Sequence, residues 1–158
     1  PASVHGSTTA PSPEEMQQSI LAGISKIHTF VDDQGEPLNE TASSFLVMVP
    51  VGLSDAARSG LSMARIAGPS TFSIDGMTIQ LAVNPRLTIA SWTDKFVVVR
   101  TDGSIKPLIR QEETATQVKV KDEASEYAFD NDAIQVGIDS WRNVGYGRWQ
   151  GACQVTLT

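Results

Sequence analysis

The sequence contains one cysteine and two histidines among its 158 residues, and this scarcity removes several classes of chemistry. A lone Cys153 can form no disulfide within the chain, and with so few histidines no zinc-site spacing exists. Catalysis by a Ser–His–acid or Cys–His arrangement needs a histidine base, and only His5 and His28 are available. Cys153 lies in an apolar, aromatic stretch, so we predict a buried structural thiol.

The chain also lacks runs of basic residues and long apolar runs. Its net charge is −6, and no three basic residues are consecutive, which disfavours direct binding to DNA or RNA. No apolar stretch approaches the roughly 20 residues that cross a bilayer, so no membrane partner is expected. Neither a Gly-rich phosphate loop nor a nucleophile elbow occurs. Asp130-Asn131-Asp132 has no EF-hand context and predicts a solvated turn. No cofactor and no metal are therefore expected.

The composition is that of a folded protein, with 41% hydrophobic and 19% charged residues. Residues 1–12 are rich in Ser, Thr, Ala and Pro and predict a flexible leader. A helix is predicted to start at Ser12, because Pro13 suits the first helical position and Glu15 completes a Ser-x-x-Glu capping box. An apolar stripe at helical spacing continues this helix to Val31.

Strand signals dominate the remainder of the chain. Asp75-Gly76 lies between two alternating runs and predicts a hairpin with a tight turn. A second helix is predicted at about 53–64. The other predicted strands are at 45–49, 86–90, 95–100, 105–109 and 117–121, and the tail 127–158 predicts long twisted strands. Two helices among about seven strands indicate the α+β class.

Two other functions remain open from the residues alone. Paired carboxylates such as Glu112/Glu113 are the only conceivable catalytic machinery, although their places at turns and strand ends favour solvated surface. The aromatic residues Trp141, Tyr146 and Trp149 are compatible with a ligand- or carbohydrate-binding module rich in β-structure. Buried tryptophans would favour a structural protein, and a solvent-facing aromatic row would favour the binding module.

Several short motifs resemble the major head subunits of Mu-like phages. The 33–38 segment, Asp-Gln-Gly-Glu-Pro-Leu, is similar to a loop of that family. Leu46-Val47-Met48-Val49-Pro50 resembles a family strand that ends in two prolines. In this sequence the second of those prolines is replaced by Val51. Asn84-Pro85-Arg86-Leu87 with Trp92, and the 106–111 segment, have similar counterparts. The most distinctive segment is 136–150, Val-Gly-Ile-Asp-Ser-Trp-Arg-Asn-Val-Gly-Tyr-Gly-Arg-Trp-Gln, preceded by Tyr127-Ala128-Phe129.

The resemblance implies the Hong Kong 97-type fold of tailed-phage capsids and a structural, non-enzymatic role as a major capsid subunit. Residues 13–115 would form an axial-type domain, with a mixed sheet and two helices. Residues 116–158 would supply strands of a peripheral-type domain, whose sheet would lack partners that family members carry upstream. The implied partners are other copies of the chain, in pentamers and hexamers, with packaged DNA contacted only indirectly. The implied location is the virion, assembled in the bacterial host cytoplasm. For subunit contacts we predict Asp75, Gly76, Trp141, Tyr146 and Trp149.

Overall fold

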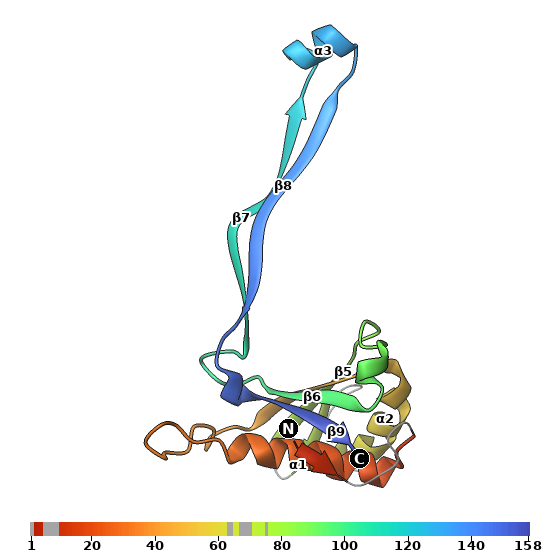
Figure 1. The fold of residues 1–158 in the computed structure, drawn as a ribbon, viewed down its shortest axis with the longest axis vertical. Coiled ribbons are helices and arrows are strands. Elements are labelled where there is room, and N and C mark those ends of the chain that lie inside the picture. Colours follow the sequence, from red (N-terminus) through yellow and green to blue (C-terminus); the bar gives the residue numbers. More distant parts are fainter. Residues whose placement is uncertain (1, 5–9, 63–64, 67–70, 75) are drawn as a thin grey trace. The chain divides into compact units, whose positions relative to one another are not determined.

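A computed structural model describes residues 2–4, 10–62, 65–66, 71–74 and 76–158. The chain divides into two compact units (Figure 1). We call Pro1–Pro107 together with Arg148–Thr158 the body, and Leu108–Gly147 the ribbon. The body contains β1 (Ala2–Val4), α1 (Pro13–His28), β2 (Ser44–Val49), η1 (Val51–Leu53), α2 (Ser54–Ser62), β3 (Arg65–Ile66), β4 (Thr71–Ile74), β5 (Met77–Val83), η2 (Ala90–Trp92), β6 (Lys95–Arg100), η3 (Trp149–Gly151) and β9 (Ala152–Leu157). The ribbon contains β7 (Leu108–Lys121), α3 (Glu126–Asn131) and β8 (Gln135–Tyr146).

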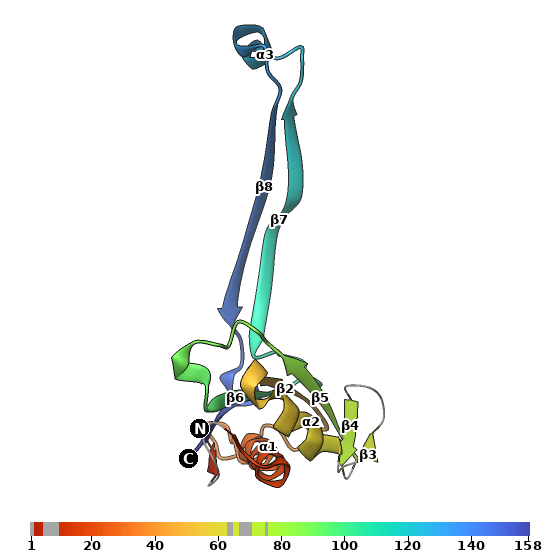
Figure 2. The same cartoon turned by 90° about the vertical axis from the view of Figure 1, so that its right-hand side faces the viewer.

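The body is built on a mixed sheet of seven strands in the order β1-β9-β6-β2-β5-β4-β3. The β2–β5 and β1–β9 pairs are parallel, and the other pairs are antiparallel. Alternate side chains of the central strands point toward α1 and α2, which lie on the same face of the sheet (Figure 2). The core contains Phe45, Val47 and Val49 of β2 and Phe96 and Val98 of β6, all fully buried.

Helix α1 begins as its sequence predicts. The Ser12 hydroxyl accepts a hydrogen bond from the backbone N–H of Glu15 at 3.2 Å, and the Glu15 carboxylate accepts one from the backbone N–H of Ser12 at 2.8 Å. The buried stripe of α1 includes Met16, Ile20 and Ile27, which lie against the sheet. His28 is the last residue of the helix, and its Nδ1 lies 3.1 Å from the carbonyl oxygen of Asn39.

Two glycines allow close packing around α1. A Cβ atom on Gly23 would lie 2.8 Å from a methyl group of Val155 and 2.9 Å from one of Val98. A Cβ on Gly60 would overlap the backbone carbonyl oxygen of Pro13, where α2 packs on the start of α1. The helices therefore approach the sheet and each other more closely than a side chain at these positions would permit.

Several strand predictions are confirmed, including those over 45–49 and 95–100 and the two strands of the 71–83 hairpin. Gly76 has φ of +82°, as its turn requires, while Asp75 lies outside the described residues. The prediction of a strand at 86–90 is wrong, because this segment turns and leads into η2. The strands predicted at 105–109 and 117–121 are instead a single long β7, which begins at Leu108.

The ends of the chain differ from the sequence prediction. Ala2–Val4, within the predicted flexible leader, pairs with β9 as an edge strand, because the outer edge of β9 leaves ladder groups to satisfy. Residues 116–158 are divided between the two units, with 116–147 in the ribbon and 148–158 in the body. Strand β9 belongs to the body, since its alternating Cys153, Val155 and Leu157 are buried in the core. The predicted buried thiol of Cys153 is confirmed, with 4% of the residue exposed.

Candidate interaction surface

The ribbon is a two-stranded antiparallel sheet whose strands are joined by a turn and α3. Pairing runs from Leu108 opposite Tyr146 to Lys121 opposite Gln135. The register shifts twice, between Glu112 and Thr114 and between Thr114 and Gln117. Each shift places one extra residue in β7, so the two bulges together restore the original alternation of faces. Strand β8 has no extra residue, and its even-numbered side chains share one face along its whole length.

One face of the ribbon carries two groups of apolar side chains open to solvent, with Arg110, Glu112, Ser140 and Arg142 between them. Val118 lies opposite Ile138, and Val120 lies opposite Val136. We call the following seven side chains the apolar face: Leu108, Val118, Val120, Val136, Ile138, Val144 and Tyr146. Each is between 56% and 92% exposed. Two-stranded ribbons are marginally stable in water unless one face is covered, and an exposed apolar surface of this extent marks an interaction site.

The opposite face is mainly polar, although it also carries the exposed side chains of Ile109 and Trp141. Lys119 forms an ion pair with Asp139, its Nζ lying 2.7 Å from a carboxylate oxygen. The pKa of Asp139 is lowered by this hydrogen bond from Lys119 and by the lysine charge, with smaller contributions from the Trp141 side chain and the Ser140 backbone. Antiparallel sheets with one apolar face and one polar face are typically packed on the apolar face and solvated on the polar face.

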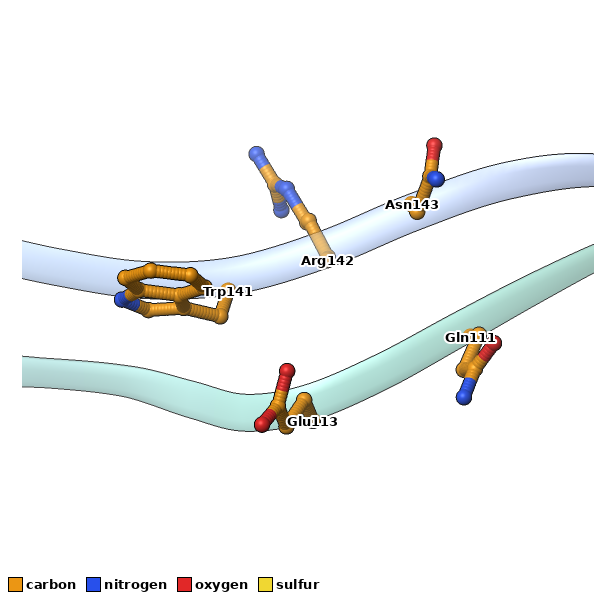
Figure 3. Close-up of a pocket in the computed structure, with 5 residues that line it drawn as sticks. All are labelled: Gln111, Glu113, Trp141, Arg142 and Asn143. Carbon is orange, nitrogen blue, oxygen red and sulfur yellow. The ribbon is translucent and has the colours of Figure 1, made fainter.

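A shallow hollow of about 360 Å³ lies beside the first bulge (Figure 3). Trp141, Arg142 and Asn143 come from β8, and Gln111 and Glu113 come from β7. Glu113 is the extra residue of the first bulge, between the Glu112–Arg142 and Thr114–Trp141 pairs. All five side chains are exposed, so the hollow holds no buried charged group that could act as an acid or base.

A cluster of hydrogen-bonded polar side chains in the body has a structural role. Asn39 is 2% exposed, and its side-chain amide donates to the carbonyl oxygens of Ile27 at 2.8 Å and Gln150 at 2.9 Å. Its Oδ1 accepts a hydrogen bond from Arg100 at 3.0 Å, and Arg100 also pairs with Asp102 at 2.5 Å. Every one of these groups is satisfied within the body, so the cluster fastens the 38–43 loop to β6 and η3.

Asp102 has a perturbed pKa for the same structural reason. Partial burial raises the pKa of its carboxyl, but hydrogen bonds from Arg100 and from the Ser43 backbone, together with the guanidinium charge, outweigh burial and lower the pKa. Its carboxylate accepts from the Ser43 N–H at 2.8 Å. The ionised carboxylate of Asp102 therefore holds the loop at Ser43 to Arg100.

The predicted contact residues fall in different parts of the structure. Gly76 is exposed at the β4–β5 turn of the body. Trp141 and Tyr146 lie on β8, 62% and 92% exposed. Trp149 is 64% exposed in η3, edge-on to Phe30 with 5.3 Å between ring centroids. Of the apolar face, only Tyr146 is among the predicted contact residues, although the alternating Val118 and Val120 and the alternating Val136 and Ile138 are a signal of an apolar strand face.

The exposed aromatic side chains do not form a binding platform. Trp141 and Tyr146 point to opposite faces of β8, since one is odd-numbered and the other even-numbered in an unbroken strand. Trp149 belongs to the body. The tryptophans at 141 and 149 are not buried, contrary to the expectation for a structural protein, yet they make no aromatic row either. The exposure of these two tryptophans therefore favours neither the structural role nor the binding module.

Within the described ranges, no group of three or more His, Cys, Asp or Glu side chains is placed to hold a metal ion. No helix among the described residues is long and apolar enough to span a membrane. The pattern that remains is an α/β body with a satisfied interior and a ribbon with one uncovered apolar face.

A comparison with solved structures identifies the fold. The structure matches a chain of the asymmetric unit of the mature capsid of bacteriophage PhiM1, with a TM-score of 0.57 and 14% sequence identity, over 99% of this chain. The fold is therefore that of a phage capsid protein, as predicted. The chain spans 51% of the length of that capsid chain.

The family comparison is more specific. Residues 88–158 match the model of the Mu-like prophage major head subunit gpT. The predicted resemblance to Mu-like major head subunits is thereby confirmed, over a segment that contains the whole ribbon, β9 and the distinctive 136–150 motif. None of the curated proteins compared with the chain matches it.

Proposed function

We propose that this chain is a structural part of a major head subunit of a tailed phage or prophage and assembles with other copies of itself into an icosahedral shell. The apolar face of the ribbon is the observation that carries this function. The ribbon exposes seven apolar side chains on one face, and a two-stranded sheet of this kind is stabilised when another surface covers that face. The fold match to a capsid chain and the family match over 88–158 support the same role.

The finer features of this proposal follow from shell assembly. The partners are other copies in pentamers and hexamers, and packaged DNA is contacted only indirectly, in keeping with a net charge of −6. The location is the virion, with assembly in the host cytoplasm and no contact with membrane. The body takes the axial role and the ribbon the peripheral one, with the division at Leu108 and Gly147 instead of 115/116. Surface complementarity repeated by symmetry requires no catalytic group.

The test is a concentration series followed by light scattering and electron microscopy, on this chain and on the full-length gene product. Rings, sheets or shells from either are the expected result. If both remain monomeric at high concentration across a range of salt, the structural role is excluded. A glycan-array screen then tests the other open function, in which Trp141, Tyr146 or Trp149 contacts a ligand.

A further inference from the structure

The far end of the ribbon, around α3, carries a second apolar surface with a different electrostatic character. A hollow of about 560 Å³ is lined by Phe129, Ile134 and two alanines, Ala128 and Ala133. Phe129 is 91% exposed and Ile134 is 57% exposed. The aromatic ring of Phe129 is thus held at the surface without cover, which is costly unless a partner buries it.

The rim of this hollow is acidic. Glu123 and Asp132 line it directly. Between Asp122 and Asp132 the chain has five acidic residues, Asp122, Glu123, Glu126, Asp130 and Asp132, and no basic residue. None of the five forms an ion pair with another described residue. An apolar hollow with a negative rim fits an apolar side chain flanked by cations.

The body carries an apolar side chain flanked by cations, in the residues that precede and follow the ribbon in the sequence. Ile105 is 52% exposed and lines a hollow of about 340 Å³ together with Arg148. The neighbouring Lys106 is exposed, and the backbone N–H of Arg148 donates to the Lys106 carbonyl at 3.3 Å, so the two cations are held in adjacent segments.

The charges of this surface are not cancelled within the chain. Among the described residues, neither Lys106 nor Arg148 forms an ion pair. The Lys106 ammonium donates only to the neutral carbonyl oxygen of Thr101. The nearby Asp102 is already paired with Arg100 at 2.5 Å, so it leaves the two cations uncompensated.

We propose that the α3 end of the ribbon in one copy docks on the Ile105 surface of a second copy. Ile105 packs against Phe129 and Ile134 in the acidic hollow, while Lys106 and Arg148 face the carboxylates of Glu123 and Asp132 on its rim. The contact joins two different surfaces of the same chain, so it is heterologous and generates a ring or an extended array. This inference rests on the proposed self-assembly and names one contact that directs it.

Charge reversal with rescue tests the electrostatic part. Lys106→Glu with Arg148→Glu, and separately Glu123→Lys with Asp132→Lys, are each expected to weaken self-association about tenfold or more by sedimentation at low salt. The four substitutions combined restore it to within about threefold of the starting protein. Arg58→Glu with Arg86→Glu is the matched control for the Lys106 and Arg148 variant, since both residues are exposed on the body and the net charge falls by the same amount. Equal weakening by the control, or no rescue, overturns the docking.

Cross-linking between two separately purified variants tests the geometry. Ser104→Cys lies beside Ile105 and Ala133→Cys lines the acidic hollow, both in a Cys153→Ala background. A mixture of the two is expected to give a covalent dimer with a short bismaleimide, whereas Ala133→Cys mixed with Arg58→Cys gives none. If the chain assembles but no Ser104–Ala133 dimer forms, the docking is wrong and the proposed function stands. If neither this chain nor the full-length product assembles, both fail.

Discussion

At the scale of single residues, close backbone packing is the most sensitive feature of the body. Gly60→Ala is expected to lower the free energy of unfolding by about 1–3 kcal/mol, because the new methyl group meets the rigid carbonyl of Pro13 and forces α2 away from α1. Gly52→Ala is the matched control, since a Cβ there has no atom within 4 Å. Urea unfolding followed by circular dichroism measures both. An unchanged midpoint for Gly60→Ala would contradict the close α1–α2 contact.

Asp102 gives a prediction about acid. Its folded-state pKa is lowered by Arg100 and Ser43 despite partial burial, so its ionised form stabilises the fold above the unfolded pKa near 4 and this contribution is lost as pH falls through the lowered folded pKa. Asp102→Asn should therefore be less stable than the starting protein at pH 7, with the difference shrinking at pH 3. The exposed Asp33→Asn serves for comparison. A difference that persists unchanged at pH 3 would contradict an electrostatic role.

Local signals in the sequence predicted many individual residues correctly. Ser12, Pro13 and Glu15 specify a helix start through contacts within four residues, so no tertiary information was needed. Cys153 was placed in the core by its apolar surroundings. Asn39 could not be found in this way, because its importance comes from the carbonyl groups of Ile27 and Gln150, which are remote in sequence.

At the scale of elements, the apolar face of the ribbon should govern self-association. Val118→Thr with Ile138→Thr removes apolar surface while keeping residues that favour strands, so the dissociation constant for self-association should rise about tenfold. Lys119→Gln with Asp139→Asn is the matched control on the opposite face, where an exposed ion pair contributes little. Sedimentation velocity over a concentration series measures both. If the control weakens association as strongly as the apolar pair, the face assignment is wrong.

The ribbon also shows why elements were missed. The two bulges between Glu112 and Gln117 interrupt the alternation of β7, so the sequence predicts two short strands, at 105–109 and 117–121, in place of one long strand. Helix α3 has only six residues, and its N-cap is Ser125, whose hydroxyl accepts a hydrogen bond from the Ala128 N–H at 3.3 Å. A single capped turn of this length has no apolar periodicity to read. Its aromatic residues Tyr127 and Phe129 therefore fall in the segment that the sequence predicts as strand.

At the scale of the whole molecule, the ribbon is an insertion in the body. Its two ends leave from adjacent positions, since Arg148 N–H donates to the Lys106 carbonyl and Gly151 lies against Pro107. Replacing Leu108–Gly147 by a short Gly-Ser linker should leave the body folded, with a cooperative thermal transition, because the body core contains no ribbon residue. The same variant should not self-associate. Loss of the thermal transition would show that the body depends on the ribbon.

The position of β9 has a consequence for how the protein is made. This strand lies between β1 and β6, and its Val155 packs on Gly23 of α1, yet it follows all the other described elements in the chain. While the ribosome is still translating the ribbon, β6 has one unpaired edge and α1 has no β9 surface beneath it. The body can close only after residue 157 has left the ribosome. The strand that completes the sheet of the body is thus separated from the rest of that sheet by the whole time needed to translate the ribbon.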